Sequence, residues 1–305
     1  FDWHVLEPNH QSGVPPTSET SRRRNDMIMI KVAVVGGGIT GCSFASTLAK
    51  LFSEDRNGPS STSSSTDNNN VEIHLFDQGR SGVGGRTSHR VVVVDDKNNN
   101  DDDANKMILR WDHGCQFFRA DTPELQTIQE TEWMPKGFTQ EWKGDFAGDG
   151  DFFGFPHRPP FYTAAQGGIK SLCQSIVEEY KNNEYIHVHE QVRVIDMKHQ
   201  QQQSEQEAKT NHNNRQKWTL FGTTGDAAFH DTPEQKHSTR IVLGQDFDAV
   251  VLTDLSSCFD SWHRASSGVP ADFAQRVRHK AGARVPLFTC MIALERPLDV
   301  ALDAF

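Results

Sequence analysis

The stretch Val34-Val35-Gly36-Gly37-Gly38-Ile39-Thr40-Gly41 follows a short β-branched run and precedes a segment with apolar residues at helical spacing. A GxGxxG between a strand and a helix has the context that a dinucleotide-binding turn requires. Gly36 permits the tight turn, Gly38 lets the backbone approach a pyrophosphate, and Gly41 lets the helix pack close to the strand. The helix N-terminus then offers unpaired N–H groups and a positive dipole to the phosphates.

An acidic residue in the right register supports this interpretation. In dinucleotide-binding βαβ units an acid meets the ribose hydroxyls about 20 residues after the glycines. Asp77 lies 36 residues after Gly41, and leaving out the 17 polar residues 54–70 reduces the spacing to 19. Added length in a surface loop costs little free energy. The predicted unit comprises a strand over 31–35, a helix over 40–52 and a strand over 71–77.

A second glycine-rich segment follows the acid and ends in Gly84-Gly85-Arg86. Glycines here permit a second backbone approach to a pyrophosphate, and a guanidinium offsets its charge with directional hydrogen bonds. A fold that binds only NAD does not need this element, so it favours FAD. The alternative is a flexible Gly-Ser loop with an incidental arginine, because glycine loops are permissive by nature.

These motifs together resemble the FAD-dependent amine oxidase superfamily and, within it, the renalase-like NAD(P)/FAD-dependent oxidoreductases. The family's strand with GxGxxG, its acid followed by GGR, and its Asp-x-Gly-x-Gln segment are all present, the last as Trp111-Asp112-His113-Gly114-Cys115-Gln116-Phe117-Phe118. Weaker similarity lies in 161–169, in Val192-Arg193-Val194-Ile195 and in 247–253. The resemblance covers about 30–295 and identifies FAD as the expected cofactor.

Carried over residue by residue, the resemblance implies an FAD site. Its expected members are Gly36, Gly38, Thr40 and Gly41 on the pyrophosphate, Asp77 on the adenosine ribose, Gly84, Gly85 and Arg86 on the phosphates, Val192 on the adenine through its backbone, and Gly114, Cys115 and Gln116 near the isoalloxazine. For the last three the alternative is a turn between core strands. No catalytic acid, base or nucleophile is predicted, because the flavin itself accepts the hydride.

The expected fold class is α/β, with a Rossmann-like FAD/NAD(P)-binding domain and a second, mostly antiparallel α+β substrate domain. The first would be discontinuous, from 30–112 and 186–256, and the second would comprise 113–185 and 257–305. A leader over 1–28 and insertions over 54–70, 95–106 and 198–214 are too polar to offset ordering entropy, so we predict that they are disordered. Family members close with a Gly-Asp segment and a helix aimed at the flavin, and this sequence lacks both, so we expect its C-terminal part to be missing.

Periodicity in the rest of the chain predicts further elements. They are a hairpin of 90–94 with 107–111, a helix over 168–180, and strands over 185–197, 217–222, 240–243, 247–253 and 285–294.

Composition excludes several other classes of protein. The formal net charge is −10, which argues against nucleic acid as a partner because such binders need a basic face. Five cysteines without a CxxC pair predict neither a zinc knuckle nor a disulfide scaffold, so we expect a reducing, cytoplasmic location. No metal site is predicted, since His187 and His189 alternate on an expected strand as surface histidines do. The uncharged run 32–49 contains the glycine turn and is a poor membrane span.

The expected activity is that of an FAD-dependent oxidoreductase. It would remove hydride from a small-molecule substrate, either an amine or a reduced nicotinamide-type compound, with oxygen reoxidising the flavin. Two alternatives remain: an NAD(P)-dependent Rossmann dehydrogenase that uses the same βαβ unit, and a truncated relative without catalytic activity. The residues do not distinguish between the substrates and do not indicate an oligomeric state.

Overall fold

The computed structural model describes residues 29–57, 70–95, 106–143, 151–152, 155–156, 160–181, 185–199, 217–225, 240–260, 263, 266–280, 291–294 and 296. The leader predicted over 1–28 and most of the three predicted insertions lie outside these residues. Residues 54–57, which the sequence assigned to the first insertion, instead form the last turn of a helix.

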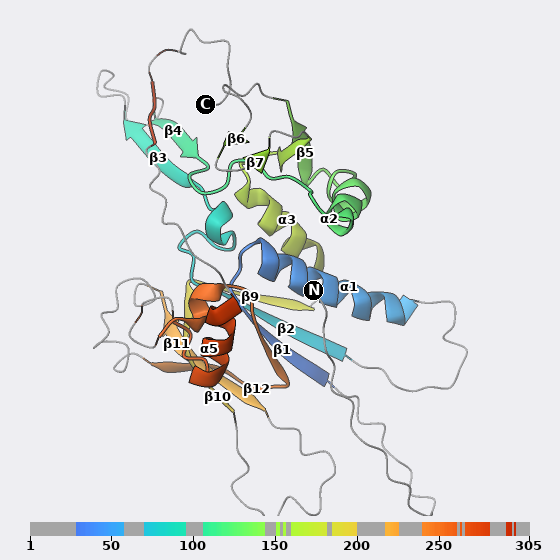
Figure 1. The fold of residues 1–305 in the computed structure, drawn as a ribbon, viewed down its shortest axis with the longest axis vertical. Helices are drawn as coiled ribbons and strands as arrows, with labels where there is room; N and C mark the ends of the chain where they lie inside the picture. The colour runs from blue at the N-terminus through green and yellow to red at the C-terminus, as the bar shows by residue number, and fades with distance from the viewer. Residues whose placement is uncertain are drawn as a thin grey trace, which may run out of the picture.

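A four-stranded parallel sheet forms the centre of the fold, and the predicted βαβ unit lies within it (Figure 1). Its elements are β1 (Met29–Val35), α1 (Ile39–Asn57), β2 (Asn70–Asp77), β9 (Ile186–Glu190) and β13 (Ala249–Leu252). The strand order is β13-β1-β2-β9, and each neighbouring pair is parallel. The carboxyl ends of β13, β1 and β2 therefore meet at one edge of the sheet.

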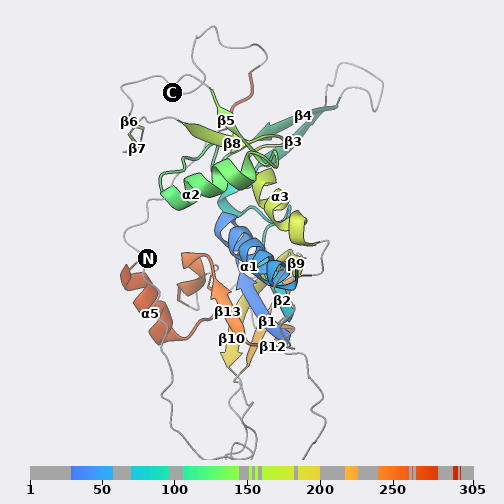
Figure 2. The ribbon, with the colours of Figure 1, turned by 90° about the vertical axis from the view of Figure 1, so that its right-hand side faces the viewer.

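Both faces of this sheet are covered, as is usual for parallel sheets. Val32 and Val34 of β1 face a core shared with α1 and α3 (Lys170–Lys181), whereas Ala33 and Val35 face a second core on the opposite side. The second core is closed by an antiparallel sheet of β10 (Val192–His199), β11 (Trp218–Thr224) and β12 (Ile241–Phe247). In Figures 1 and 2 the helices α1 and α3 lie on one side of the parallel sheet and the antiparallel sheet lies on the other.

Several of the predicted strands have different boundaries in the structure. The run 185–197 is not one strand, because Gln191 adopts φ 56° and divides it into β9 of the parallel sheet and β10 of the antiparallel sheet. Phe247 ends β12 and does not begin the next strand. Residues 291–294 of the strand predicted over 285–294 are described but form no strand, and 285–290 lie outside the described residues.

The remaining elements lie mostly beyond the carboxyl edge of the parallel sheet (Figure 2). The predicted hairpin is present, with Arg90 opposite Trp111. Thr122 accepts a hydrogen bond from the Leu125 N–H and so caps the N-terminus of the helix Pro123–Ile128. The elements are η1 (Gly85–Thr87), β3 (Arg90–Asp95), β4 (Lys106–Trp111), α2 (Pro123–Ile128), the π-helical turn η2 (Gln129–Trp133), β5 (Thr139–Trp142), β6 (Asp151–Phe152), β7 (Phe155–Pro156) and β8 (Phe161–Ala164), with η4 (Leu255–Cys258) and α5 (Ala271–Lys280) lying lower.

In the part of the chain that the structure describes, no helix combines the length and the apolar character needed to cross a bilayer. The uncharged run 32–49 consists of β1, the glycine turn and the start of α1.

Candidate functional site

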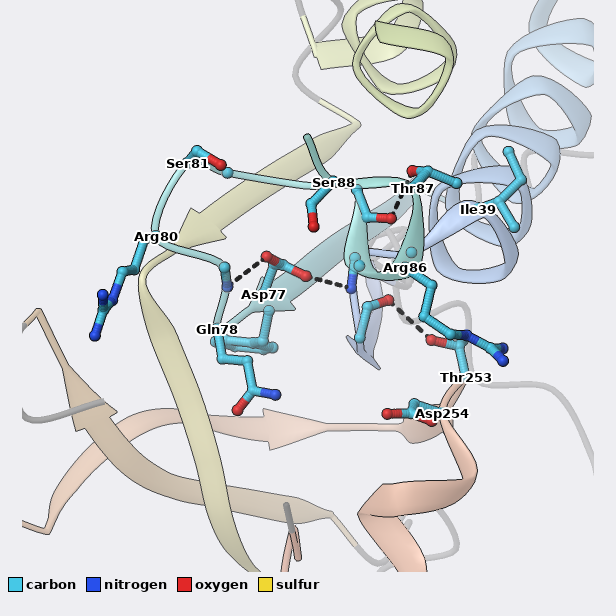
Figure 3. A pocket seen from close by; sticks show the side chains of 18 of the residues that line it. Ile39, Asp77, Gln78, Arg80, Ser81, Arg86, Thr87, Ser88, Thr253 and Asp254 are labelled. Carbon is cyan, nitrogen blue, oxygen red and sulfur yellow. Dashed lines mark hydrogen bonds between the residues drawn. The ribbon is translucent and has the colours of Figure 1, made fainter. Parts of the chain in front are cut away.

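A pocket of about 720 Å³ opens where β1, β2 and β13 end and α1 begins (Figure 3). Ligands of open α/β sheets bind outside the carboxyl ends of the strands. The pocket's size also lies within the range usual for cofactor sites. Most of its lining residues come from four segments: the turn after β1, the loop 77–90 after β2, the start of β10, and the residues that follow β13.

The first glycine turn has its shape because side chains are excluded at three positions, of which Gly37 is one, since a Cβ there would lie 2.6 Å from the Asp77 Oδ2. Gly36 has φ 106°, and a Cβ there would lie 2.6 Å from the Thr253 Oγ1. A Cβ on Gly41 would lie 1.9 Å from the carbonyl oxygen of Gly36, so only glycine lets α1 start this close to the turn. A Cβ on Gly38 would meet nothing within 4 Å. The backbone of Gly38 is therefore open to an approaching ligand.

Asp77 connects the two glycine segments. Its Oδ2 accepts a hydrogen bond of 2.9 Å from the Gly37 N–H, and its Oδ1 accepts one of 2.7 Å from the Gly79 N–H (Figure 3). The residue is only 5% exposed. Burial raises the pKa of the Asp77 carboxyl, against the opposing effect of the two backbone hydrogen bonds and of Lys170. Asp77 thus fixes the loops that form the pocket, and it also lines the pocket itself.

The second glycine segment packs directly on the first. The Gly84 N–H donates to the Gly37 carbonyl over 2.8 Å, and a Cβ on Gly85 would lie 3.1 Å from the Gly38 Cα. Gly84 and Gly85 have φ 148° and 54°. The Thr87 hydroxyl closes the turn by donating to the Gly84 carbonyl. Because both segments are glycine, their backbones form one continuous wall of the pocket.

Positively charged side chains outnumber carboxylates around the pocket. Its lining includes four arginines and two aspartates, although the whole chain has a net charge of −10. The arginines are Arg80, Arg86, Arg90 and Arg193, and the aspartates are Asp77 and Asp254. In Figure 3 the exposed Arg86 side chain extends across the opening toward Thr253 and Asp254, whereas Arg80 points away. This local excess of positive charge suits an anionic ligand.

The structure brings most of the predicted site residues together. Those that line the pocket are Gly36, Gly38, Thr40, Asp77, Gly84, Gly85, Arg86 and Val192. Gly41 lies behind the turn, where it contacts the Gly36 carbonyl.

Gly114, Cys115 and Gln116 are not among the residues that line the pocket. A Cβ on Gly114 would lie 2.2 Å from the Arg86 carbonyl, so Gly114 packs behind the second glycine segment. The Cys115 thiol donates to the Phe117 carbonyl over 3.3 Å, and burial raises its pKa, so the sulfur stays protonated. The Gln116 carbonyl accepts a hydrogen bond from Thr163. In this structure the three residues have packing and turn contacts.

Sequence reasoning missed several residues of the site. Thr253 closes the turn from the third strand, because its hydroxyl lies 3.0 Å from the Val35 carbonyl and 2.8 Å from the Gly36 carbonyl. Lys170 is 3% exposed, and its ammonium donates to the Ser81 carbonyl beneath the second glycine segment. Arg193 lines the pocket beside the predicted Val192. The position of Thr253 after an apolar strand is a signal that could have identified it.

We expect Asp77→Asn to loosen the pocket. An amide has one acceptor oxygen where the carboxylate has two, so one backbone N–H loses its partner. The free energy of unfolding should fall by about 1–3 kcal/mol in urea titrations at pH 7. Asp272→Asn, at a position 81% exposed on α5, is the control and should change it by less than about 0.5 kcal/mol.

The pH dependence gives a second readout for this variant. Because the pKa of Asp77 is raised in the folded chain, the folded state holds the proton more readily than the unfolded state does. The contribution of Asp77 to stability therefore falls as the pH rises above the ordinary value of 3.8. Asp77→Asn should remove this part of the pH dependence. An unchanged stability profile for the variant would contradict the assigned role.

No protein-family model matches this sequence, and no curated protein sequence matches it. Among solved structures, the chain is similar to p-nitrophenol 4-monooxygenase PnpA from Pseudomonas putida DLL-E4, with 14% identity, 75% of this chain and 41% of that chain covered, and a TM-score of 0.35. It is also similar to THI4 from Thermovibrio ammonificans, with 14% identity, 84% and 64% covered, and a TM-score of 0.37. The polycyclic ketone monooxygenase from Thermothelomyces thermophila has 14% identity, 77% and 24% covered, and a TM-score of 0.32. The chain spans less than two thirds of the length of each of these structures, and at these TM-scores the similarity supports no conclusion about ligand or reaction.

Proposed function

We propose that this chain binds FAD in the glycine-lined pocket and belongs to a flavin-dependent oxidoreductase. The observation that carries the proposal is the contact of two glycine segments, Gly36–Gly38 and Gly84–Gly85, at the edge where three parallel strands end. Their backbones leave room for a ligand to come close at Gly38, and Arg86 extends across the opening. A pyrophosphate needs both features: close N–H donors and compensating positive charge.

The residues of the pocket fit the parts of FAD in a definite order. The N-terminal turn of α1, with Gly38 and Thr40, would hold the pyrophosphate, and Arg86 would reach over it. Asp77 would accept a hydrogen bond from a ribose hydroxyl, because its two backbone donors leave carboxylate lone pairs available. Val192, at the start of β10, would meet the adenine. When bound, the flavin supplies the hydride acceptor, and this chain's residues bind and orient it.

The substrate proposal rests on the resemblance of the sequence motifs to the renalase-like oxidoreductases. We propose an amine or a reduced nicotinamide-type compound as the hydride donor and oxygen as the final acceptor. An NAD(P)-dependent dehydrogenase is the second candidate, because the βαβ unit by itself suits either dinucleotide. The continuous wall formed by the second glycine segment favours FAD.

We also propose a division into two halves that differs from the sequence-based one in three respects: α3 and the segment before α5 join the nucleotide-binding half, and the β3–β4 hairpin joins the substrate half. The half that binds the nucleotide comprises the parallel sheet, α1 and the antiparallel sheet. We add α3 to it, because Leu172, Cys173 and Ile176 pack in the core of the parallel sheet. We also add the segment before α5, because Val269 packs against the second core. The substrate half would then be formed around the β3–β4 hairpin, α2 and the β5–β8 pair.

The first experiment identifies the cofactor. The purified chain should show the visible absorption of an oxidised flavin, and FAD should be released on denaturation. Release of NAD(P) would replace the proposal by the second candidate. If no dinucleotide is found and added FAD does not bind, the proposal is wrong. Bound FAD without turnover of amines or dihydronicotinamides would leave the binding proposal and reject the substrate proposal.

Arg86→Ala should weaken FAD binding about ten-fold or more, because a charge-assisted hydrogen bond contributes about 1.5–3 kcal/mol. Flavin fluorescence titration measures the dissociation constant. Arg276→Ala, which removes an arginine that is 74% exposed on α5, is the matched control and should leave the constant unchanged. Equal affinities for the two variants would show that Arg86 does not contact the phosphates.

A further inference from the structure

Four titratable side chains gather on the face of the parallel sheet opposite α1. Successive side chains of a strand alternate between faces, so Glu72 and His74 of β2 share a face, and His187 and His189 of β9 do too. His74 lies beside His187 in the register of the two parallel strands. None of the four lines the pocket. The sequence presented the two β9 histidines as ordinary surface residues, and the pairing of β9 with β2 brings them to a carboxylate.

Three ligand atoms of this cluster lie close together. The Glu72 Oε1 is 2.6 Å from the His74 Nε2 and 3.8 Å from the His187 Nε2. All three atoms lie within 4.8 Å of one another, which holds for no other group of histidine, cysteine, aspartate and glutamate in the described part of the chain. In a tetrahedral zinc site with bonds of about 2.0–2.1 Å, neighbouring ligand atoms are about 3.3 Å apart. The two measured separations lie on either side of this value.

We propose that Glu72, His74 and His187 bind a divalent transition-metal ion, and that Zn²⁺ is the ion they suit best. Two imidazoles and one carboxylate are ligands that Zn²⁺ takes at three positions, which leaves a fourth position for water. The ion would replace the proton that His74 and Glu72 now share in their hydrogen bond.

His189 is the positioning residue of this site. Its Nε2 lies 2.9 Å from the His74 Nδ1, and the two rings are stacked with 5° between their planes. With the metal on the His74 Nε2, the Nδ1–H donates to the His189 Nε2, which fixes the tautomer and the orientation of the ligand. Without metal, the His74 Nε2–H donates to Glu72 and the Nδ1 accepts from His189. When the metal binds, His74 and His189 each change tautomer, and neither residue loses a proton.

The groups of this cluster and Lys31 act on one another electrostatically. Burial, as the largest cause, lowers the pKa of His74 to about 4, and it lowers that of His189 too. For Glu72, burial raises the pKa, but the hydrogen bond and charge of His74 outweigh this and leave it lowered. Lys31 opposes the binding of a cation at this cluster, because its positive charge acts on Glu72, His74 and His189.

A metal here would join an edge strand to its neighbour. Among the described residues, β9 is the outermost strand of the parallel sheet and pairs there with β2. Two ligands on β2 and one on β9 would cross-link the pair. An ion that binds only the folded chain stabilises it in proportion to the logarithm of its concentration over the dissociation constant. Zn²⁺ should therefore raise the melting temperature of the chain.

The test uses the full chain without a histidine tag and Zn²⁺ as the probe. Isothermal titration should give one site with a dissociation constant of about 1 µM or lower. His187→Gln and Glu72→Gln should each weaken this site at least ten-fold, and His189→Gln should weaken it by about ten-fold as well. His279→Gln, an exposed histidine on α5, is the matched control and should bind as the unaltered chain does. Circular dichroism should show that each variant is folded.

Two further measurements separate this site from weak binding elsewhere. Co²⁺ should give the intense visible bands of tetrahedral coordination, and His187→Gln should abolish them. Lys31→Met should strengthen Zn²⁺ binding several-fold, since it removes the opposing charge and keeps the length of the side chain. The proposal is wrong if Zn²⁺ does not bind at micromolar concentration, or if the double variant Glu72→Gln with His187→Gln binds as tightly as the unaltered chain.

Discussion

Gly38→Val is expected to abolish FAD retention without unfolding the chain. A Cβ at this position meets no atom within 4 Å in the structure, so the first carbon of the added side chain enters open space. It would, however, occupy the space through which a pyrophosphate approaches the backbone. Losing about two hydrogen bonds to a charged phosphate costs about 3 kcal/mol or more, which is a loss of affinity of about 100-fold or more.

A graded pair of variants makes the measurement of this prediction sharp. Gly38→Ala should retain part of the flavin and Gly38→Val none, because the second side chain extends further from the backbone. Flavin occupancy after gel filtration measures retention, and the melting curve of the apoprotein measures the fold. Full occupancy in Gly38→Val would show that no dinucleotide backbone passes over this turn. A collapse of the melting curve would instead contradict the open space seen at Gly38.

Gly41→Ala is expected to lower the free energy of unfolding of the protein, whereas Gly38→Val is expected to affect only FAD binding. Its Cβ would lie 1.9 Å from the carbonyl oxygen of Gly36, inside the contact distance of any two atoms. The start of α1 would have to move away from the turn, and the contact of the turn with Thr253 would be lost with it. The expected cost is about 3 kcal/mol or more, as for severe overpacking in a core.

Urea unfolding at one pH measures this cost, and Thr47→Ala in the same helix is the control. Thr47 is exposed, so its replacement by alanine should change the free energy of unfolding by less than about 0.5 kcal/mol. Gly41→Ala should also lose flavin, but only together with stability. If it unfolds like the unaltered chain, the close approach of α1 to the turn is wrong. The two glycine variants thus separate the surface that faces a ligand from the surface that holds the turn.

The sequence determined the local elements of this protein because short-range periodicity specifies them. The β-branched run of β1, the helical spacing of α1 and the alternation of β2 were each readable, as was the hairpin of β3 and β4. The spacing of glycines and of Asp77 located one wall of the pocket. These features depend on contacts between residues near in the chain, or on a turn that only glycine permits.

Tertiary structure alone decided which distant residues meet. The periodicity of 185–197 gave no sign that Gln191 adopts φ 56° and sends the chain from one sheet to another. Thr253 reaches the glycine turn only because β13 pairs with β1, and His187 reaches Glu72 only because β9 pairs with β2. Strand order depends on the packing of both faces of the sheet, which no local window contains. The sequence therefore determined the glycine motif, and the order of the strands decided what surrounds it.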